Sequence, residues 1–330
     1  MEPRATTNRC LVALLFLVVL PSVARPQASA PPQSCQSDEY TIRVNADSVV
    51  LHATVQNHKG ILVSGLGKDD FQVYEDGVLQ RIEYYTHEDI PVTVGLVVDN
   101  SGSMRPNRPE VIAAALMFAR SSNPQDQMFV INFNENVSFG LPDNTPFTDQ
   151  AAQLQAALSR IAADGMTALY DGVAVALEHL KKGNRDKKVL IVVSDGGDNA
   201  SKHNLGQVMV MAGQSDAIIY TIDIFVPEDP DRNPNALRQL AKATGGEAFL
   251  PRSVSEVVPI CERIARDIRN QYTLAYGPTN TKQDGAYRAI LVKAGAPGRG
   301  RLFVRTRAGY YAPSKPEPAP ALAGSQSNRP

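Results

Sequence analysis

Oxygen-bearing side chains recur at three places where an apolar run ends or a helical pattern begins. The first is "DNSGS", which follows an apolar run and places Asp99, Ser101 and Ser103 within five residues. The second is "DGMTALYDG", where Thr167 precedes a helical pattern, and the third is "VVSDGGDN", where Asp195 follows another apolar run. A turn alone can be built from Asn, Asp and Gly, so two carboxylates and three hydroxyls indicate a binding site.

An all-oxygen donor set selects a hard cation. Magnesium takes oxygen ligands in near-octahedral geometry at about 2.0–2.1 Å and commonly retains waters. When few carboxylates of the protein coordinate the ion directly, the ion stays electron-poor. A coordination position occupied by water can then accept a carboxylate from a partner. We therefore expect a Mg²⁺ site, with Ca²⁺ and Mn²⁺ as alternatives, formed by Asp99, Ser101, Ser103, Thr167 and Asp195.

The elements that must position these residues alternate between strands and helices. Apolar strands are predicted at residues 92–98, 128–133, 189–193 and 218–225, and helices near 109–121, 150–162, 168–181, 202–213 and 234–243. A last helix is predicted from Ser253, which forms a capping box with Glu256, to about Arg269. Apolar strands separated by helices indicate an α/β fold with a doubly wound, mostly parallel sheet covered on both faces. Ligands of such sheets bind at the carboxyl ends of the strands, where the three polar stretches should meet.

Two β-rich segments flank this α/β domain, which spans residues 91–270. Residues 40–90 and 271–313 are rich in β-branched and aromatic residues with local alternation. The favoured organisation joins both segments into one small sandwich-like module with the α/β domain inserted, which is easy when a domain's termini lie close together. Two separate β modules are the alternative.

The N-terminus predicts export. Arg4 and Arg9 precede an eleven-residue apolar run at 10–20, which is too short to span a bilayer. Small residues follow, so residues 1–24 are predicted to be a cleaved signal peptide. An uncleaved membrane anchor is the alternative. After cleavage we expect no membrane insertion and a periplasmic, cell-surface or extracellular location.

Two segments are predicted to lie outside the folded domains. Residues 25–39 form a linker rich in Pro, Gln, Ser and Ala, and residues 314–330 form a disordered tail of similar composition. Signal cleavage leaves Cys35 and Cys261 in an oxidising compartment. They either form a disulfide or stay separate thiols, because sequence does not show whether their Cα atoms lie within about 7 Å.

Composition and motifs narrow the chemistry. The net charge is −1, which provides no basic field for nucleic acid. The five histidines are dispersed without HExxH spacing, which argues against a zinc site. Phosphate-loop and nucleophile-elbow motifs are absent from the sequence.

A magnesium phosphohydrolase with Asp99 as nucleophile is the enzyme alternative, but Ser101 occupies the position where a general acid is expected. The nearby acids are expected to serve turns or caps: Asp164, Asp171 and Asp198.

The three motifs together carry a family resemblance. Asp-x-Ser-x-Ser, a later Gly-x-Thr and a strand-terminal Ser-Asp-Gly, in this order inside an α/β domain, resemble a von Willebrand factor type A (VWA) domain with a metal-ion-dependent adhesion site. The flanks "LVSGLGKDDFQVYEDGVLQRIEYY" and "VRTRAGYYAP" resemble secreted bacterial VWFA-related proteins. The resemblance covers roughly residues 40–313.

The resemblance implies roles and a function. Ser101 and Ser103 would bind the metal directly, Thr167 directly or through water, and Asp99 and Asp195 largely through waters. The expected function is a secreted, Mg²⁺-dependent protein-binding or adhesion module, not an enzyme, in which a partner Asp or Glu completes the coordination. The alternative is a structural or assembly protein of the cell envelope whose metal only stabilises the fold. The family also implies that the last helix can shift with the metal site.

Overall fold

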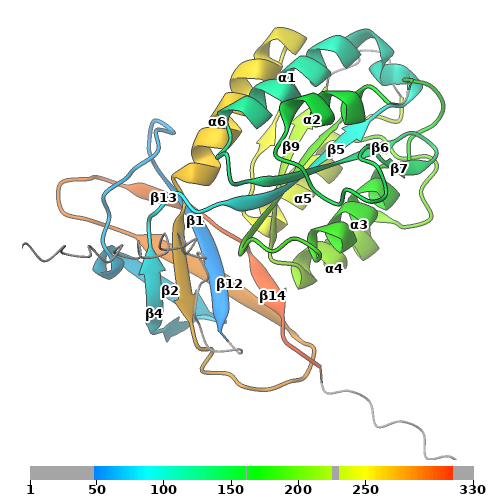
Figure 1. The fold of residues 1–330 in the computed structure, drawn as a ribbon. Coiled ribbons are helices and arrows are strands. Elements are labelled where there is room, and N and C mark those ends of the chain that lie inside the picture. Colours follow the sequence, from blue (N-terminus) through cyan, green and yellow to red (C-terminus); the bar gives the residue numbers. More distant parts are fainter. Residues whose placement is uncertain (1–47, 161, 225–229, 315–330) are drawn as a thin grey trace, which may run out of the picture. The chain divides into compact units, whose positions relative to one another are not determined.

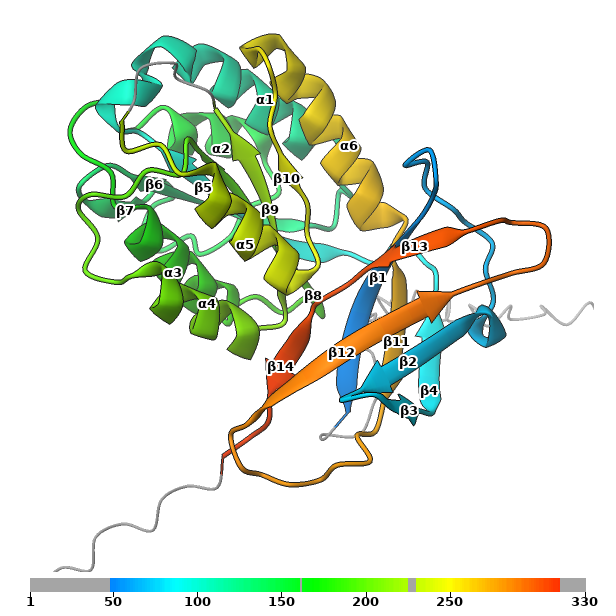
Figure 2. The same ribbon diagram turned by 180° about the vertical axis from the view of Figure 1, so that it is seen from behind.

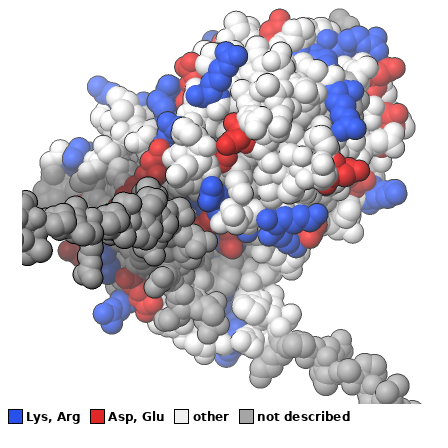
Figure 3. All heavy atoms as spheres, in the orientation of Figure 1, with Lys and Arg blue, Asp and Glu red and all other residues white. Residues whose placement is uncertain are grey.

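The computed structural model describes residues 48–160, 162–224 and 230–314 (Figure 1). The predicted signal peptide, the linker with Cys35, and the C-terminal tail beyond residue 314 lie outside the described residues. Within the described ranges, no helix is long and apolar enough to cross a membrane. Acidic and basic side chains are interspersed over the face shown in Figure 3.

A six-stranded sheet forms the centre of the α/β domain. Its strand order is β10 (Ala248–Phe249), β9 (Ala217–Asp223), β8 (Lys187–Ser194), β5 (Val92–Asp99), β6 (Gln127–Phe133) and β7 (Val137–Phe139). All neighbours are parallel except the pair of β6 and β7. Every residue of β5 and of β9 is buried, as expected for strands covered on both faces. The predicted α/β class with a mostly parallel sheet is confirmed.

Helices cover both faces of this sheet. α1 (Arg108–Ser121) packs against α2 (Ala151–Leu158) and α6 (Val257–Arg269), whereas α4 (Leu205–Gln214) packs against α3 (Leu169–Leu180) and α5 (Pro234–Thr244) (Figures 1 and 2). A 3₁₀ turn, η2 (Gly102–Asn107), leads into α1, and Pro109 stands in its first turn.

The start of the last helix differs from the prediction. A 3₁₀ turn, η3 (Val254–Glu256), precedes α6, and Ser253 makes no side-chain cap. The Glu256 carboxylate accepts the N–H of Arg252 at 3.1 Å, and the Ser253 hydroxyl bonds that of Ser255 at 2.8 Å. The predicted capping box is therefore wrong, because both side chains are satisfied by other local partners.

Strands from before and after the α/β domain pair with each other in two antiparallel sheets. One has the order β13 (Leu302–Arg305), β1 (Val49–Asn57), β11 (Tyr272–Tyr276), β4 (Ile82–Thr86). The other has the order β14 (Gly309–Tyr311), β12 (Tyr287–Ala294), β2 (Phe71–Glu75), β3 (Val78–Gln80). A second apolar core, which includes Leu51, Val73, Leu274 and Val292, joins side chains of both sheets. We call this pair of sheets the β module.

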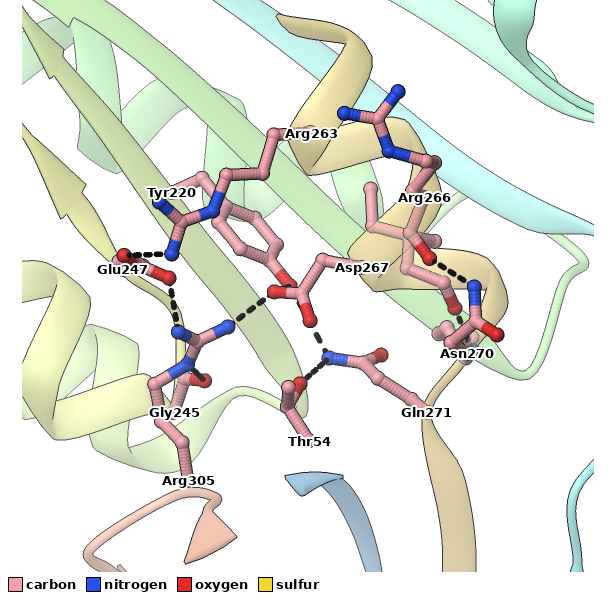
Figure 4. Close-up of polar contacts among 12 residues, drawn as sticks. Thr54, Tyr220, Gly245, Glu247, Arg263, Arg266, Asp267, Asn270, Gln271 and Arg305 are labelled. Carbon is pink, nitrogen blue, oxygen red and sulfur yellow. Dashed lines mark hydrogen bonds and ion pairs between the residues drawn. The ribbon is translucent and has the colours of Figure 1, made fainter. Parts of the chain in front are cut away.

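A partly buried ion network links the β module to the α/β domain (Figure 4). Arg305 of β13 makes ion pairs with Glu247, next to β10, and with Asp267 of α6. The same Asp267 carboxylate accepts the Tyr220 hydroxyl at 2.7 Å. Gln271 donates to the Tyr220 hydroxyl at 3.2 Å. Side chains from elements far apart in the sequence therefore converge on the end of α6.

Cys261 lies in α6 as a free, buried thiol. Burial raises its pKa to about 12, so the thiol is inert as a nucleophile at neutral pH. The predicted bridge to Cys35 stays a prediction, since its other end lies outside the described residues.

Candidate metal centre

The first motif lies in the loop at the carboxyl end of β5. Asp99 is the last residue of that strand and is buried. The N–H of Ser101 donates to its Oδ1 at 2.8 Å, which closes the loop around the carboxylate. Asn100 fastens the loop to β6, since its N–H donates to the Phe133 carbonyl at 2.7 Å and its side-chain amide donates to Asn132 Oδ1 at 3.1 Å. These hydrogen bonds hold the loop in place at the carboxyl end of the sheet.

The two serine hydroxyls of this loop connect it to the third motif. Ser101 Oγ lies 3.2 Å from Ser103 Oγ, and the Ser103 hydroxyl donates to Asp195 Oδ2 at 3.0 Å. An ionised carboxylate only accepts hydrogen bonds. The hydrogen of Ser103 is therefore committed to Asp195, and Ser103 accepts from Ser101. Each hydroxyl oxygen therefore keeps at least one lone pair for a ligand.

Asp195 follows β8 and is also buried. Its Oδ1 accepts the N–H of Gly197 at 3.0 Å. Gly196 between them has φ +83°, and a Cβ there would stand 2.3 Å from the Asn233 carbonyl oxygen. Only glycine fits such a left-handed, crowded position, so the turn that presents Asp195 requires it.

Ser194 is a site residue that sequence reasoning missed. Its hydroxyl donates to Asp99 Oδ2 at 2.7 Å and accepts the N–H of Gly196 at 3.1 Å. Ser194 thereby connects the Asp99 carboxylate of the first motif to the turn that presents Asp195 in the third. The available signal was its place immediately before Asp195 at the end of an apolar run.

Thr167 belongs to the loop before α3 and is connected through its backbone. Its N–H donates to Asn199 Oδ1 at 2.9 Å, and its carbonyl accepts the N–H groups of Asn199 and Ala200 at 2.9 and 3.0 Å. Upstream, the Gly165 carbonyl accepts the N–H of Gly102 at 3.1 Å, which ties this loop to the first motif. Among the described residues, no hydrogen bond joins the Thr167 hydroxyl to the other four predicted ligands. The structure thus links the side chains of Ser101, Ser103 and Asp195 to one another. Asp99 is joined to them through the N–H of Ser101, and Thr167 is held on an adjoining loop.

The three acids expected in turns or caps lie around these loops. Asp198 accepts the N–H of Tyr170, in the first turn of α3, at 2.9 Å. Asp171 accepts the N–H groups of Lys202 and His203, both at 3.0 Å. Asp164 pairs with Arg105 at 3.0 Å on the surface. These contacts hold the rim of the site and leave the central positions to the predicted ligands.

The electrostatics of the centre favour a cation. Burial raises the pKa of Asp99 to about 7, the negative charge of Asp195 adds to the rise, and hydrogen bonds from Ser101 and Ser194 oppose it. Burial and the neighbouring negative charge both disfavour the ionised form of Asp99, and a bound cation would favour it. The donor set therefore fits a hard cation.

The chemistry of the donors also limits which metal fits. No group of three or more His, Cys, Asp or Glu side chains that could hold a metal occurs in the part of the chain that the structure describes. A cation at this centre would need the hydroxyl oxygens as well as the carboxylates, and such oxygen sets suit magnesium, calcium or manganese.

The family assignment comes from the sequence of this region. The model of the von Willebrand factor type A domain family matches residues 94–197, from within β5 to just beyond Asp195. The chain contains a VWA domain. All five predicted ligands lie inside the matched range or at its end, and their assignment as ligands stays a prediction.

Comparisons with other proteins add the following. No curated protein matches the chain. Among solved structures, a von Willebrand factor type A protein from Catenulispora acidiphila is 14% identical over 81% of this chain and 74% of its own, with a TM-score of 0.47. The vWF domain of the type V pili tip protein Mfa5 from Porphyromonas gingivalis is 14% identical over 55% of this chain and 95% of its own, with a TM-score of 0.46. The pilus adhesin SpaC from Lactobacillus rhamnosus GG is 13% identical over 75% of this chain and 48% of its own, with a TM-score of 0.46.

Proposed function

We propose that this protein is a secreted binding module whose VWA domain holds Mg²⁺ and, through it, an acidic side chain of a protein partner. The observation that carries the proposal is the hydrogen-bonded chain from Ser101 through Ser103 to Asp195. Asp99 is joined to this chain by the N–H of Ser101 and is also held by the Ser194 hydroxyl. It assembles two carboxylates and two hydroxyls at the carboxyl end of a parallel sheet, where ligands of such sheets bind.

The predicted ligands would have different roles in holding the ion. The hydroxyl oxygens of Ser101 and Ser103 would contact the ion, while their hydrogens stay directed along the chain that ends at Asp195. Asp99 and Asp195 supply the negative charge and orient the hydroxyls. Thr167 would add a third hydroxyl from the adjoining loop. Bound Mg²⁺ supplies an electrophilic position that accepts a carboxylate oxygen.

A binding role fits this arrangement better than catalysis. Both oxygens of Asp99 accept hydrogen bonds inside the fold, and only 2% of the residue is exposed. A nucleophilic carboxylate needs access to its substrate. Position 101, where a phosphohydrolase would place its general acid, is a serine within the hydrogen-bonded chain. We therefore favour adhesion or assembly, with a protein and not a nucleic acid as partner, at the cell surface, in the periplasm or outside the cell.

Calorimetric titration of Mg²⁺ into the metal-stripped mature protein tests the site. We expect saturable one-site binding that is lost in the Ser101→Ala, Ser103→Ala double variant and kept in Ser122→Ala. Ser122 is the matched control because its hydroxyl donates to the Phe118 carbonyl at 2.9 Å, at the end of α1 and outside the proposed metal centre. No saturable binding by the unmodified protein would refute the metal site.

Selection from a displayed peptide library in Mg²⁺, with elution by EDTA, tests the partner chemistry. Selected peptides should contain an Asp or Glu, and replacing it by Asn or Gln should abolish binding. Acid-free peptides that survive EDTA would contradict the carboxylate mechanism. Full partner binding by the double-serine variant would instead favour a metal that only stabilises the fold.

A further inference from the structure

The outer face of the second sheet of the β module is apolar. In β12 the side chains alternate, so that Ile290 and Val292 enter the module core while Tyr287 and Leu291 point outward. Tyr287 is 47% exposed and Leu291 is 53% exposed. One face of an antiparallel sheet normally meets water with polar side chains, so an apolar outer face indicates a partner.

The apolar residues form one continuous row across three strands. Leu291 of β12 stands opposite Tyr74 of β2, and Tyr74 stands opposite Leu79 of β3, which is 57% exposed. These three strands lie side by side in Figure 2. Tyr287 lies on the same face of β12. Its ring packs edge-on against the ring of Tyr311 of β14, with 5.3 Å between the ring centres. We call the row Leu291–Tyr74–Leu79 the apolar row.

Opposite charges flank the apolar row. On one side, Lys293 stands opposite Gln72, and its ammonium lies 4.8 Å from the centre of the Tyr74 ring. On the other side, the Asp76 carboxylate accepts the N–H of Ala289 at 2.9 Å. Lys293 lies two residues from the row along β12, or about 7 Å at the usual strand rise. Asp76 lies two residues after Tyr74, in the turn that follows β2.

This pattern is self-complementary. We propose that the outer face of this sheet binds a second copy of the chain, in a symmetric dimer whose twofold axis runs along the apolar row. Rotation by 180° about that axis places two such faces against each other and reverses the strand direction. Lys293 of each copy then faces the Asp76 side of the other, and the apolar rows meet at the centre. An apolar centre with a charged rim is the usual anatomy of a protein interface.

Sedimentation velocity of the mature chain tests the dimer. From about 1 to 100 μM, a range that covers micromolar dissociation constants, we expect a monomer–dimer equilibrium. Leu291→Asp should raise the dimer dissociation constant about tenfold or more, because it buries two charges at the centre of the interface. Leu250→Asp is the matched control, since Leu250 is an exposed leucine of the α/β domain, and it should leave the equilibrium unchanged. A monomer at every concentration overturns the proposal, as does a dimer that Leu291→Asp leaves intact.

Cross-linking tests the position of the axis in a Cys35→Ser background. A residue on the twofold axis meets its own copy across the interface, at about the 10 Å that separates packed sheets. A short bis-maleimide linker should therefore join two copies of Leu291→Cys. Lys293→Cys is displaced about 7 Å from the axis in each copy, so its copies stand farther apart and should cross-link much less. Equal cross-linking of both variants would refute the proposed axis.

Discussion

Replacing Arg305 by methionine tests the partly buried ion network at the junction of the β module and the α/β domain. The Arg305 side chain is 23% exposed and that of Asp267 only 4%. Methionine retains much of the aliphatic packing but removes the charge, so Asp267 keeps the Tyr220 hydroxyl and loses its cation. Removing one member of a buried ion pair costs about 3–5 kcal/mol, because the remaining charge stays buried without compensation. We expect the free energy of unfolding to fall by that amount.

Urea denaturation measures this loss, and the chain contains a matched control. Arg263 binds the same Glu247 at 2.7 Å, but its side chain is 46% exposed. Arg263→Met should therefore cost about 0–1 kcal/mol, as surface pairs do. Equal losses in the two variants would refute the reasoning that burial decides the energy.

A double variant separates the lost pair from the stranded charge. If most of the loss comes from the uncompensated carboxylate, Arg305→Met combined with Asp267→Leu should be more stable than Arg305→Met alone, since apolar replacement of a buried pair is often neutral. A double variant that is less stable than the single one would show that the carboxylate contributes through its other contacts instead.

Three further predictions concern the VWA domain. Ser194→Ala removes the hydroxyl that orients Asp99. Contacts that support metal ligands typically contribute about tenfold in affinity, so calorimetry should show Mg²⁺ binding weakened by about that factor while the protein stays folded. Gly95→Ala should lower the unfolding free energy in urea by about 1–3 kcal/mol, since its Cβ would lie 2.4 Å from a phenylalanine ring carbon of β6. Gly295→Ala, with nothing within 4 Å of its Cβ, is the control. Burial lowers the pKa of Lys187 to about 8, below its unfolded value of about 10.4. Between these pH values the unfolded chain binds the proton that the native chain lacks, so stability should rise with pH, and Lys187→Met should abolish that rise.

Local sequence patterns predicted the α/β class well, since apolar runs of strand length and amphipathic helical stretches each reflect burial of their own residues. The same reasoning failed where side chains had several local partners. At the start of α6, Glu256 accepts from Arg252 and not from Ser253, and no spacing rule distinguishes those two N–H groups. The predicted helix at 150–162 also ends early, at Leu158.

The sequence by itself determined which oxygen-bearing residues stand in the three motifs, and that Asp99 and Asp195 follow strands of a parallel sheet. Only the tertiary structure decided which atoms meet: Ser103 with Asp195, and Ser194 with Asp99, pairs separated by 92 and 95 residues. It likewise decided that β1 pairs with β11 and β13, and that Arg305 reaches Asp267. The physical reason is that periodicity records whether a residue is buried, whereas its partner depends on how distant segments pack. The oxygen-bearing motifs could therefore be located in advance, whereas the hydrogen bonds among them could not, and their role as metal ligands stays a prediction.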